Sequence, residues 1–493
     1  MKRFFNQTQT HLNENIRPVF KSPFRGDLGG LYNMKTKFAF IFATMVLLPL
    51  ISKAQNPVIQ TNYTADPAPM VHNGTVYLYT SHDEDVTVKN FFTMNDWRCY
   101  STTDMVNWTD HGAILSYKVF EWSRGDAWAG QCVYRNGKFY YYLPVNQKNG
   151  ENAIGVAVSD SPTGPFKDAI GKPLLSGYGY IDPTVFIDDD GQAYLYWGNP
   201  NLWHVKLNED MVSYDKEPGI VKEDLKDENF GYRSKKIDNR TASYEEGPWL
   251  YKRNSLYYLL YPAGGVPEHL AYSTAKGITG PWTYGYTIMH VIKEGGAFTN
   301  HQGLIDFKGK PYLFYHNGAL PGGGGFKRSV CVEQFTFNAD GSIPLIQPTK
   351  EGVKESVANL NPYTRVEAET MAWSQGCSVG QNKKNGVYVS NTHLHGYTKV
   401  REVNFGKHSP KSFTASLAAE VAGGILEVRL DSVSGSIISS IQLSSTGGWD
   451  KFKRFTSELK QRVTGKHDVY ICFNGQNITS GHKLFNFDWW LFR

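Results

Sequence analysis

The sequence predicts an all-β protein in which a five-bladed β-propeller is followed by a β-sandwich of the jelly-roll type. Two observations carry this prediction. A short unit returns five times between residues 66 and 312, each time as an opening residue, a turn eight or nine residues later, and a tyrosine three residues after the turn. After about residue 346 this pattern stops, and a linker leads into alternating strands with an aromatic C-terminus.

The five units open with five different residues at intervals of 54 to 64 residues. They are Asp66-Pro-Ala-Pro with Gly74 and Tyr77, Trp128-Ala-Gly with Gly137 and Tyr140, Asp182-Pro-Thr with Gly191 and Tyr194, Glu246-Gly-Pro with Asn254 and Tyr257, and His301-Gln-Gly with Gly309 and Tyr312. A Gly or Asn turn between alternating apolar segments predicts a β-hairpin. The intervals are long enough for one four-stranded blade per unit.

The changing opener is a functional signal. A single Asp-Pro or Glu-Gly unit is usually an ordinary junction between a loop and a strand, since turn residues dominate such places. Equivalent positions on radially repeated blades, however, lie around one axis. Two aspartates, one glutamate, one tryptophan and one histidine are therefore predicted to meet there as an active site.

The remainder of the chain predicts a second all-β unit. Alternating strands are expected at residues 413–419, 425–430 and 469–473, and the length of this region suits a sandwich. We therefore divide the chain into a propeller over 55–346, a linker over 347–362 and a sandwich over 363–493.

The N-terminus has the pattern of a secretory signal peptide over residues 34–54. A positive segment, Met34-Lys-Thr-Lys37, precedes an apolar run over 38–51 that only Thr44 interrupts, and small residues follow at Ser52 and Ala54. We interpret residues 1–33 as a mis-annotated start upstream of Met34. The mature protein is expected to be secreted or periplasmic without a membrane span, and an uncleaved anchor is the alternative.

Charge and cysteine content argue against a nucleic-acid partner and against a metal ion bound by cysteines. The net charge of +5 comes from residues 1–54, because the rest of the chain has 43 basic and 44 acidic residues. No basic surface for nucleic acid is therefore expected. The five cysteines lack metal-site spacing, and both a Cys377–Cys472 bridge and buried free thiols remain open.

Three carboxylates among the openers suggest hydrolysis of a glycosidic bond. That reaction needs one carboxyl group to protonate the leaving oxygen and another to activate water or attack carbon. Crowding of like charges raises the pKa of the least solvated carboxyl group, which lets a glutamate act as a proton donor near neutral pH.

Three segments resemble the signature blocks of glycoside hydrolase family 43. They are Asp66-Pro-Ala-Pro, the run from Tyr180 through Asp182-Pro-Thr to Gly191, and Glu245-Glu246-Gly-Pro-Trp-Leu-Tyr-Lys252. The resemblance implies a five-bladed propeller of inverting glycosidases, mainly α-L-arabinofuranosidases and β-xylosidases, whose chemistry needs no cofactor. It implies Asp66 as general base, Asp182 as the residue that tunes the pKa of the donor, and Glu246 as general acid. Glu245 is the competitor for the acid.

The same resemblance implies three residues that contact the sugar. Trp128 would stack on a pentose ring, although Gly130 stands where the family usually has proline. His301 would lie under the pocket on the axis, and the family often has a calcium ion or a water beside this histidine. Arg328 would bind sugar hydroxyls, with a solvated surface charge as the alternative.

The C-terminal unit resembles carbohydrate-binding modules of family 6. The matching segments are Val366-Glu367-Ala-Glu369, the run from Ser444 to Trp449, and Asn486-Phe-Asp488-Trp. The resemblance implies a structural calcium ion bound by Glu367, Glu369 and Asp488. It also implies a sugar cleft formed by Tyr388, Trp449 and Asn486, and a buried core position is the alternative for Trp449.

Together these features predict a secreted, inverting exo-glycosidase that releases α-L-arabinofuranose or β-D-xylose from arabinoxylan-type plant polysaccharides. The expected partner is a plant cell-wall polysaccharide or oligosaccharide, and the expected state is a monomer. A galactan-directed glycosidase of the same family and an inactive carbohydrate-binding or adhesion protein are the alternatives. The three crowded carboxylates argue against the last, because a binding site alone has no use for them.

Overall fold

The protein is described by a computed structural model that covers residues 55–493 apart from 235–238, 477 and 479–480. The predicted signal peptide and the segment before it lie outside these described residues. Within the described part, no helix has the length and the apolar character needed to cross a membrane. Strands dominate this part, and short helical turns occur at η2 (Tyr117–Val119), α2 (Asp227–Phe230) and η3 (Glu294–Gly296).

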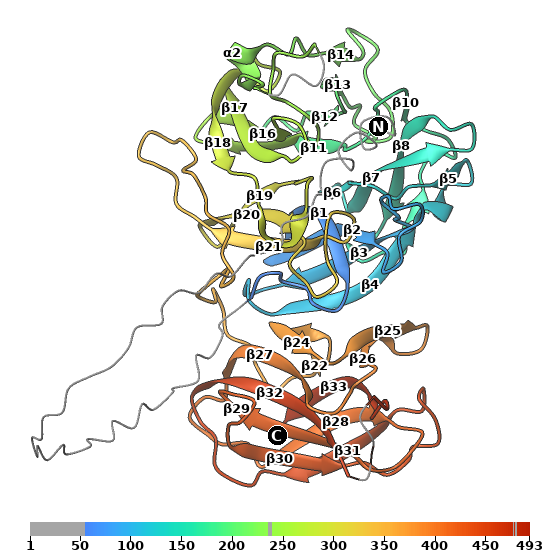
Figure 1. Ribbon diagram of the computed structural model, residues 1–493, viewed down its shortest axis with the longest axis vertical. Coiled ribbons are helices and arrows are strands. Elements are labelled where there is room, and N and C mark those ends of the chain that lie inside the picture. Colours follow the sequence, from blue (N-terminus) through green and yellow to red (C-terminus); the bar gives the residue numbers. More distant parts are fainter. Residues whose placement is uncertain (1–54, 235–238, 477, 479–480) are drawn as a thin grey trace, which may run out of the picture. The chain divides into compact units, whose positions relative to one another are not determined.

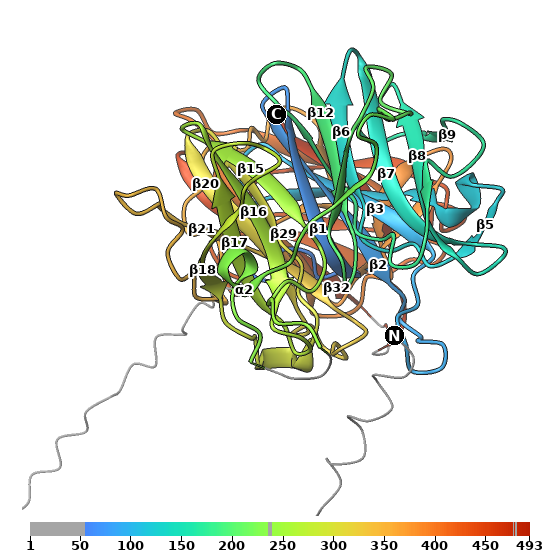
Figure 2. The ribbon, with the colours of Figure 1, turned by 90° about the horizontal axis from the view of Figure 1, so that it is seen from above.

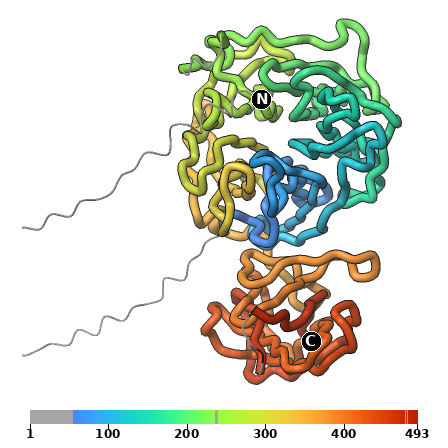
Figure 3. The backbone as a smooth tube through the Cα atoms, turned by 45° about the vertical axis from the view of Figure 1, so that its right-hand side comes forward, coloured from blue at the N-terminus to red at the C-terminus, as the bar shows by residue number. Residues whose placement is uncertain are grey.

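Residues 63–334 form five successive antiparallel sheets, as the repeated unit predicts. The tube in Figure 3 follows them around a ring from blue to yellow. Blade 1 contains β1 (Tyr63–His72), β2 (Thr75–Asp83), β3 (Asp96–Thr102) and β4 (Trp108–Ser116). Blade 2 contains β5 (Ser123–Gly125), β6 (Gln131–Arg135), β7 (Lys138–Gln147), β8 (Asn152–Ser159), β9 (Lys167–Asp168) and β10 (Leu175–Ser176).

The other three blades have the same antiparallel order. Blade 3 contains β11 (Thr184–Ile187), β12 (Ala193–Trp197), β13 (Trp203–Lys206) and β14 (Val221–Lys222). Blade 4 contains β15 (Trp249–Arg253), β16 (Leu256–Ala263), β17 (His269–Ala275) and β18 (Thr283–Met289), whose strands run side by side in Figure 2. Blade 5 contains β19 (Gly303–Phe307), β20 (Lys310–Asn317) and β21 (Ser329–Gln334).

The turns of the repeated unit explain its spacing. In blade 1, Asn73 and Gly74 both have positive φ (47° and 72°) between the paired residues His72 and Thr75. A two-residue turn with two positive φ values matches the right-handed twist of the strands it joins, and Asn-Gly adopts it at low cost. Blades 2, 4 and 5 repeat this conformation at residues 136–137, 254–255 and 308–309. The predicted hairpins are therefore confirmed.

The ring closes through the first described residues. The amide of Val58 donates to the carbonyl of Val330 (2.8 Å), and the side chain of Asn56 exchanges hydrogen bonds with the backbone of Val332 (3.2 and 3.0 Å). The segment before blade 1 therefore lies along β21 of blade 5, and the two ends of the propeller are held together.

Large apolar and aromatic side chains pack between the blades. Trp97, Tyr141 and Leu313 are fully buried in one continuous cluster, although they come from blades 1, 2 and 5. Burying a side chain of this size contributes about 1.5–3 kcal/mol. The blade openers are thus carried on a rigid scaffold.

Residues 366–492 form the predicted sandwich of two sheets. One contains β22 (Val366–Glu367), β25 (Ser378–Asn382), β26 (Gly386–Ser390), β28 (Ser412–Ala418), β31 (Lys453–Glu458) and β33 (Asn486–Phe492). The other contains β24 (Trp373–Gln375), β27 (Gly396–Asn404), β29 (Gly424–Leu430), β30 (Ile437–Gln442) and β32 (Lys466–Gly475). Phe413, Phe473 and Trp490 are buried in a core that draws on both sheets.

One strand of the C-terminal region belongs to neither sheet of the sandwich. β23 (Thr370–Met371) pairs with β4 and adds a fifth strand to blade 1. The hydroxyl groups of Thr109 and Thr370 lie 2.8 Å apart across this pairing.

All five cysteines are free thiols, so the Cys377–Cys472 bridge is wrong and the free-thiol alternative is confirmed.

Candidate active site

Four of the five openers meet, with the carboxylates of three of them around the imidazole ring of the fourth, His301. Its Nε2 lies 3.2 Å from Glu246 Oε1 and 3.9 Å from Asp182 Oδ2, and its Nδ1 lies 3.7 Å from Asp66 Oδ1. The three carboxylates come from the starts of blades 1, 3 and 4, and the histidine comes from blade 5. The ring therefore stands between the carboxylate of Asp66 and those of Asp182 and Glu246.

The backbone at the openers is specialised for this convergence. Asp66 and Asp182 have φ values of 53° and 55° in the left-handed region, which Asp and Asn adopt more readily than other residues with a side chain. Asp66 also sits in the irregular step of β1 between Ala65 and Ala68. Gly247 has φ of 52°, and a Cβ there would lie 3.0 Å from the His301 ring. The glycine after Glu246 thus lets the backbone approach the imidazole.

Asp66 is held from both sides by hydrogen bonds. Its Oδ2 accepts from the hydroxyl of Ser81 (2.8 Å), and its Oδ1 accepts from Nη1 of Arg328 (3.0 Å). Arg328 in turn donates to both oxygens of Asp83, at 2.9 Å from Nε and 3.0 Å from Nη2. Arg328 is only 3% exposed, so the solvated-surface interpretation is wrong. Its contact with sugar stays a prediction, and its bonds in the structure orient Asp66.

The charges of the cluster are strongly coupled. Burial alone would raise the pKa of Asp66, but Arg328 and His301 outweigh it and lower this pKa to about 2. Burial together with Glu246 and Asp66 raises the pKa of Asp182 to about 8. Burial opposes the charge on His301, yet Asp66, Glu246 and Asp182 raise its pKa to about 9. At neutral pH these shifts favour an ionised Asp66, a protonated His301 and one proton retained by the coupled carboxyl groups around Asp182.

Adjacent Glu245 and Glu246 have different partners. Glu245 accepts hydrogen bonds from Nη1 of Arg233 and from Nη2 of Arg240 (3.1 Å to the latter). Glu246 instead faces His301, and its Oε2 accepts from the side-chain amide of Asn199. The side chain of Glu246 therefore lies in the carboxylate cluster, whereas that of Glu245 forms ion pairs with two arginines.

Several residues of the site were not predicted from the sequence. Besides Ser81, Asp83 and Asn199, they include His316, whose Nδ1 accepts from the Asp66 amide (3.2 Å), and Glu268, whose Oε2 accepts from the Asn300 amide (2.8 Å). Glu268 is buried, and burial with the nearby Glu246 and Glu245 raises its pKa well above its ordinary value. None of these residues opens a repeated unit, so the spacing that revealed the openers could not reveal them.

Trp128, the fifth opener, is partly buried at the start of blade 2. Its carbonyl accepts from Nε1 of Trp97 (2.7 Å), and its own Nε1 is buried without a hydrogen-bond partner. Stacking on sugar stays a prediction for this residue. A Cβ on Gly130 would lie 2.7 Å from the carbonyl oxygen of Tyr142, so the backbone here has no room for the proline that the family usually carries.

The structure separates the predicted residues of the sandwich into two groups. Nδ2 of Asn486 donates to the carbonyl of Trp449 (2.6 Å), so these two residues are adjacent. Trp449 is partly exposed, with the ammonium group of Lys483 4.5 Å from its ring centre, so the buried-core alternative is wrong. Among the ring contacts of the described residues, Tyr388 is paired with Phe452 and not with Trp449.

The predicted metal ligands of the sandwich also differ from one another. Glu369 Oε2 and Asp488 Oδ1 are buried without hydrogen-bond partners, and so is Asn385 Oδ1, which the sequence did not suggest. Glu367 is instead held by Arg365, with both of its oxygens 2.7 Å from guanidinium nitrogens.

Three buried carboxylates with one protonated histidine provide an ionised base and a stored proton, as hydrolysis of a glycoside requires. Comparison with known proteins agrees with this chemistry. Residues 54–343 match the sequence model of Glycosyl hydrolases family 43. The chain belongs to family 43 of the glycosyl hydrolases. This family 43 enzyme is therefore a glycoside hydrolase, and its residues 367–493 match Carbohydrate binding module (family 6).

Its relatives include enzymes named for two pentose activities. Arabinoxylan arabinofuranohydrolase of Bacillus subtilis is 34% identical over 89% of this chain and 92% of its own length. The enzyme of the same name from Paenibacillus polymyxa is 32% identical over 89% of this chain and 74% of its own. A xylosidase/arabinosidase of Bacteroides ovatus is 32% identical over 60% of this chain and 98% of its own. One of Thermoclostridium stercorarium is 27% identical over 86% of this chain and 97% of its own.

A solved structure is similar to both parts of this family 43 enzyme. The arabinoxylan arabinofuranohydrolase of Bacillus subtilis in complex with cellotetraose has a TM-score of 0.76 and 30% identity, and the match covers 90% of this chain and 98% of that one. The five-bladed propeller followed by a sandwich is thus confirmed as the fold.

Proposed function

We propose that this family 43 enzyme removes α-L-arabinofuranosyl side groups from arabinoxylan, with inversion at the anomeric carbon. The observation that carries the proposal is the cluster of Asp66, Asp182 and Glu246 around His301. The substrate is suggested by the two arabinoxylan arabinofuranohydrolases, which align with 89% of this chain.

The burial of the cluster favours a terminal sugar over a continuous chain. The exposed fractions of Asp66, Asp182 and Glu246 are 5%, 6% and 9%. One pentose at the end of a chain or on a side branch reaches groups so shielded more easily than a continuous polysaccharide backbone does. This supports release of single sugars.

In the proposed mechanism, Asp66 accepts a proton from a water molecule whose oxygen attacks the anomeric carbon. Glu246 donates a proton to the leaving glycosidic oxygen as the bond between that oxygen and the anomeric carbon breaks. Asp66 suits the base because Arg328 and His301 keep it ionised. Burial and the crowding of Asp182 with Glu246 retain one proton in the cluster, and we propose that this proton lies on Glu246 when the glycosidic bond breaks and that Asp182 returns to the ionised form. Hydrogen bonds from Ser81 and Arg328 fix the plane of the base.

The test is to follow the sugar released from arabinoxylan and the anomer that forms first. Arabinose should be released while the length of the xylan backbone stays constant, and proton NMR should show the inverted anomer first. Release of xylose from xylo-oligosaccharides without release of arabinose would replace this proposal with a β-xylosidase. This activity is the second candidate because the Thermoclostridium relative is named a xylosidase/arabinosidase. A retained first anomer would overturn the inverting mechanism.

We also propose a structural calcium ion in the sandwich. The orphaned oxygens of Glu369, Asp488 and Asn385 are the hard donors that calcium prefers, and Glu367 would join them by leaving Arg365. Around His301 the corresponding group offers one nitrogen and two carboxylates, and calcium takes six to eight oxygen ligands, so we place the calcium ion in the sandwich. Calcium should raise the unfolding temperature of the parent enzyme and have less effect on Asp488→Asn.

We further propose export of the enzyme, on the signal-peptide pattern of residues 34–54. Protein expressed from Met34 should be found outside the cytoplasm with its N-terminus near Gln55, which N-terminal sequencing would show. We also propose that it is a monomer, which light scattering would test.

A further inference from the structure

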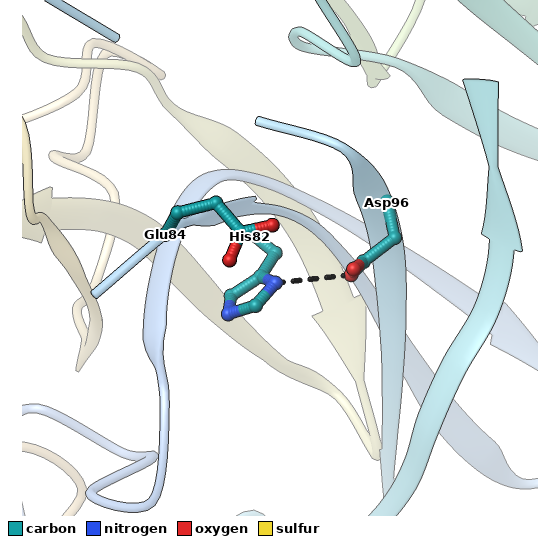
Figure 4. A group of neighbouring side chains, drawn as sticks. All are labelled: His82, Glu84 and Asp96. Carbon is teal, nitrogen blue, oxygen red and sulfur yellow. Dashed lines mark hydrogen bonds and ion pairs between the residues drawn. The ribbon is translucent and has the colours of Figure 1, made fainter. Parts of the chain in front are cut away.

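A second group of ionisable side chains lies in blade 1, outside the catalytic cluster. His82 is the second-last residue of β2, Glu84 directly follows the strand, and Asp96 begins β3 (Figure 4). Nδ1 of His82 lies 3.1 Å from Asp96 Oδ1. One nitrogen of the histidine and one oxygen from each carboxylate lie within 4.8 Å of one another. His82 is buried, and the two carboxylates are partly buried.

The alternation of β2 separates this group from the catalytic residues. Successive side chains of a strand point to opposite faces. Ser81 and Asp83 point toward Asp66 and Arg328, so His82 and Glu84 point the other way. Ser81 pairs with Trp97 in β3, which brings Asp96 opposite His82. Two neighbouring strands therefore fix His82 and Asp96, and the amide of Glu84, which donates to the carbonyl of Thr93 (2.9 Å), fixes the backbone of the third residue.

The charges around the group leave it negative. The charges of Glu84, Asp96 and the nearby Asp110 all act on Arg98, whose Nε lies 3.6 Å from Asp96 Oδ1 and has no hydrogen-bond partner. The side chain of Asn95 donates to Glu84 Oε1 (2.8 Å) and leaves Glu84 Oε2 available. With His82 neutral, as a metal ligand must be, Arg98 offsets one of the three carboxylates, and a divalent cation would offset the other two.

We propose that His82, Glu84 and Asp96 form a binding site for one divalent transition-metal ion of the zinc class. Zinc takes imidazole nitrogen and carboxylate oxygen in sites with three protein ligands. Calcium instead requires six to eight oxygen ligands, so this donor set separates the two ions.

Metal binding here would stabilise the hairpin behind the catalytic base. The ion joins β2 to β3, and the segment between them carries Phe92, whose ring centre lies 4.5 Å from the guanidinium carbon of Arg328. The other face of β2 holds Arg328 through Asp83. The ion is therefore a structural clamp and takes no part in the hydrolysis.

Calorimetric titration with zinc chloride tests the proposal on the full chain, after treatment with a chelator and in excess calcium. Every protein in this experiment also carries Glu246→Gln and is compared with that variant, called the background. This substitution is needed because Asp182, Glu246 and His301 are the other group that could hold a metal among the described residues. One equivalent of zinc should bind, and adding Glu84→Gln should weaken that binding at least about ten-fold. His467→Ala is the matched control, since the ring nitrogens of His467 are 2.8 Å from Asp431 and 3.0 Å from the Thr464 carbonyl, and the substitution should leave zinc binding unchanged.

A second measurement decides the ligands. X-ray absorption of the zinc-loaded protein should show one imidazole nitrogen among the atoms bound to zinc at about 2.0–2.2 Å. In thermal unfolding without zinc, Glu84→Gln should unfold at the same temperature as its background. Zinc should then raise that temperature in the background and not in Glu84→Gln. No tight equivalent of zinc, or equal binding by Glu84→Gln, would overturn the proposal. Loss of the same binding in His467→Ala would overturn it too.

Discussion

Glu245 and Glu246 differ in function because of their partners and not their chemistry. Glu246 faces His301 in the cluster, and we assign it the proton transfer to the leaving group. Glu246→Gln should lower kcat on arabinoxylan by about 10²–10⁴-fold, the usual contribution of a general acid. The loss should be much smaller on an aryl arabinofuranoside whose leaving group needs no proton. Steady-state rates on the two substrates measure this difference.

Glu245 provides the matched comparison at the next residue. Glu245→Ala leaves the buried Arg233 without its carboxylate, and breaking a buried ion pair costs about 3–5 kcal/mol of unfolding free energy. The remaining folded enzyme should keep a kcat close to that of the parent. If kcat instead falls further in Glu245→Ala than in Glu246→Gln, the acid is assigned to the wrong residue.

His301 should make the stability of the enzyme depend on alkaline pH. Burial opposes its charge, but the three carboxylates raise its pKa from 6.5 to about 9. Because the folded pKa is above the unfolded one, this stabilisation is complete below about pH 6.5 and is lost as the pH rises through about 9. Asp182, with its pKa raised to about 8, acts in the same direction.

Urea unfolding between pH 6 and 9.5 checks this sign. The unfolding free energy of the parent should fall across that interval, and the fall should be smaller in His301→Gln, which cannot bind the proton. An equal fall in both proteins would mean that other groups cause the pH dependence.

At the scale of elements, the end of β2 links two functions through strand alternation. Ser81 and Asp83 support Asp66 and Arg328 on one face, while His82 and Glu84 meet Asp96 on the other. The end of β2 thus holds the proposed base in place on one face and contributes His82 to the proposed metal site on the other.

Asp83→Asn tests the support that β2 gives to the base. Asp83 accepts three hydrogen bonds from Arg328, and all of these atoms are buried. The change should lower the unfolding free energy by about 3–5 kcal/mol and should also lower kcat, because Arg328 orients Asp66. Asp85→Asn, two residues further along and exposed, is the control and should alter neither quantity.

The same strand shows which features a sequence can reveal. The Asn73-Gly74 turn before β2 was predictable because its conformation depends on two adjacent residues. The pair of Asp83 and Arg328 was not, because its members are 245 residues apart and no repeat relates them. Arg328 was predicted as a sugar contact from family resemblance alone, and only the structure shows that its bonds go to Asp83 and Asp66. The openers were accessible to prediction because the repeat marks them five times.

At the scale of the whole molecule, the C-terminal region is joined to the propeller by backbone pairing. β23 extends blade 1, and the side chain of Asn107 exchanges two hydrogen bonds with the backbone of Arg401 (2.9 and 2.8 Å). The Arg401 guanidinium also donates to Gln55 at the start of the propeller (2.8 Å). Deletion of the C-terminal region would remove these bonds, so point substitutions separate sugar binding from catalysis more cleanly.

Trp449→Ala in the full chain should separate the two activities. Trp449 is partly exposed beside Asn486, and a sugar would displace the Lys483 ammonium group from its ring. Because the carboxylates all lie on propeller blades, kcat on an aryl arabinofuranoside should be unchanged. Retention on insoluble arabinoxylan should weaken about ten-fold, which corresponds to about 1.4 kcal/mol. Tyr286→Ala, at an exposed tyrosine of blade 4, is the control and should retain parent binding. A Trp449→Ala enzyme that binds the polysaccharide normally but loses turnover on the aryl substrate would show instead that the sandwich serves the catalytic site.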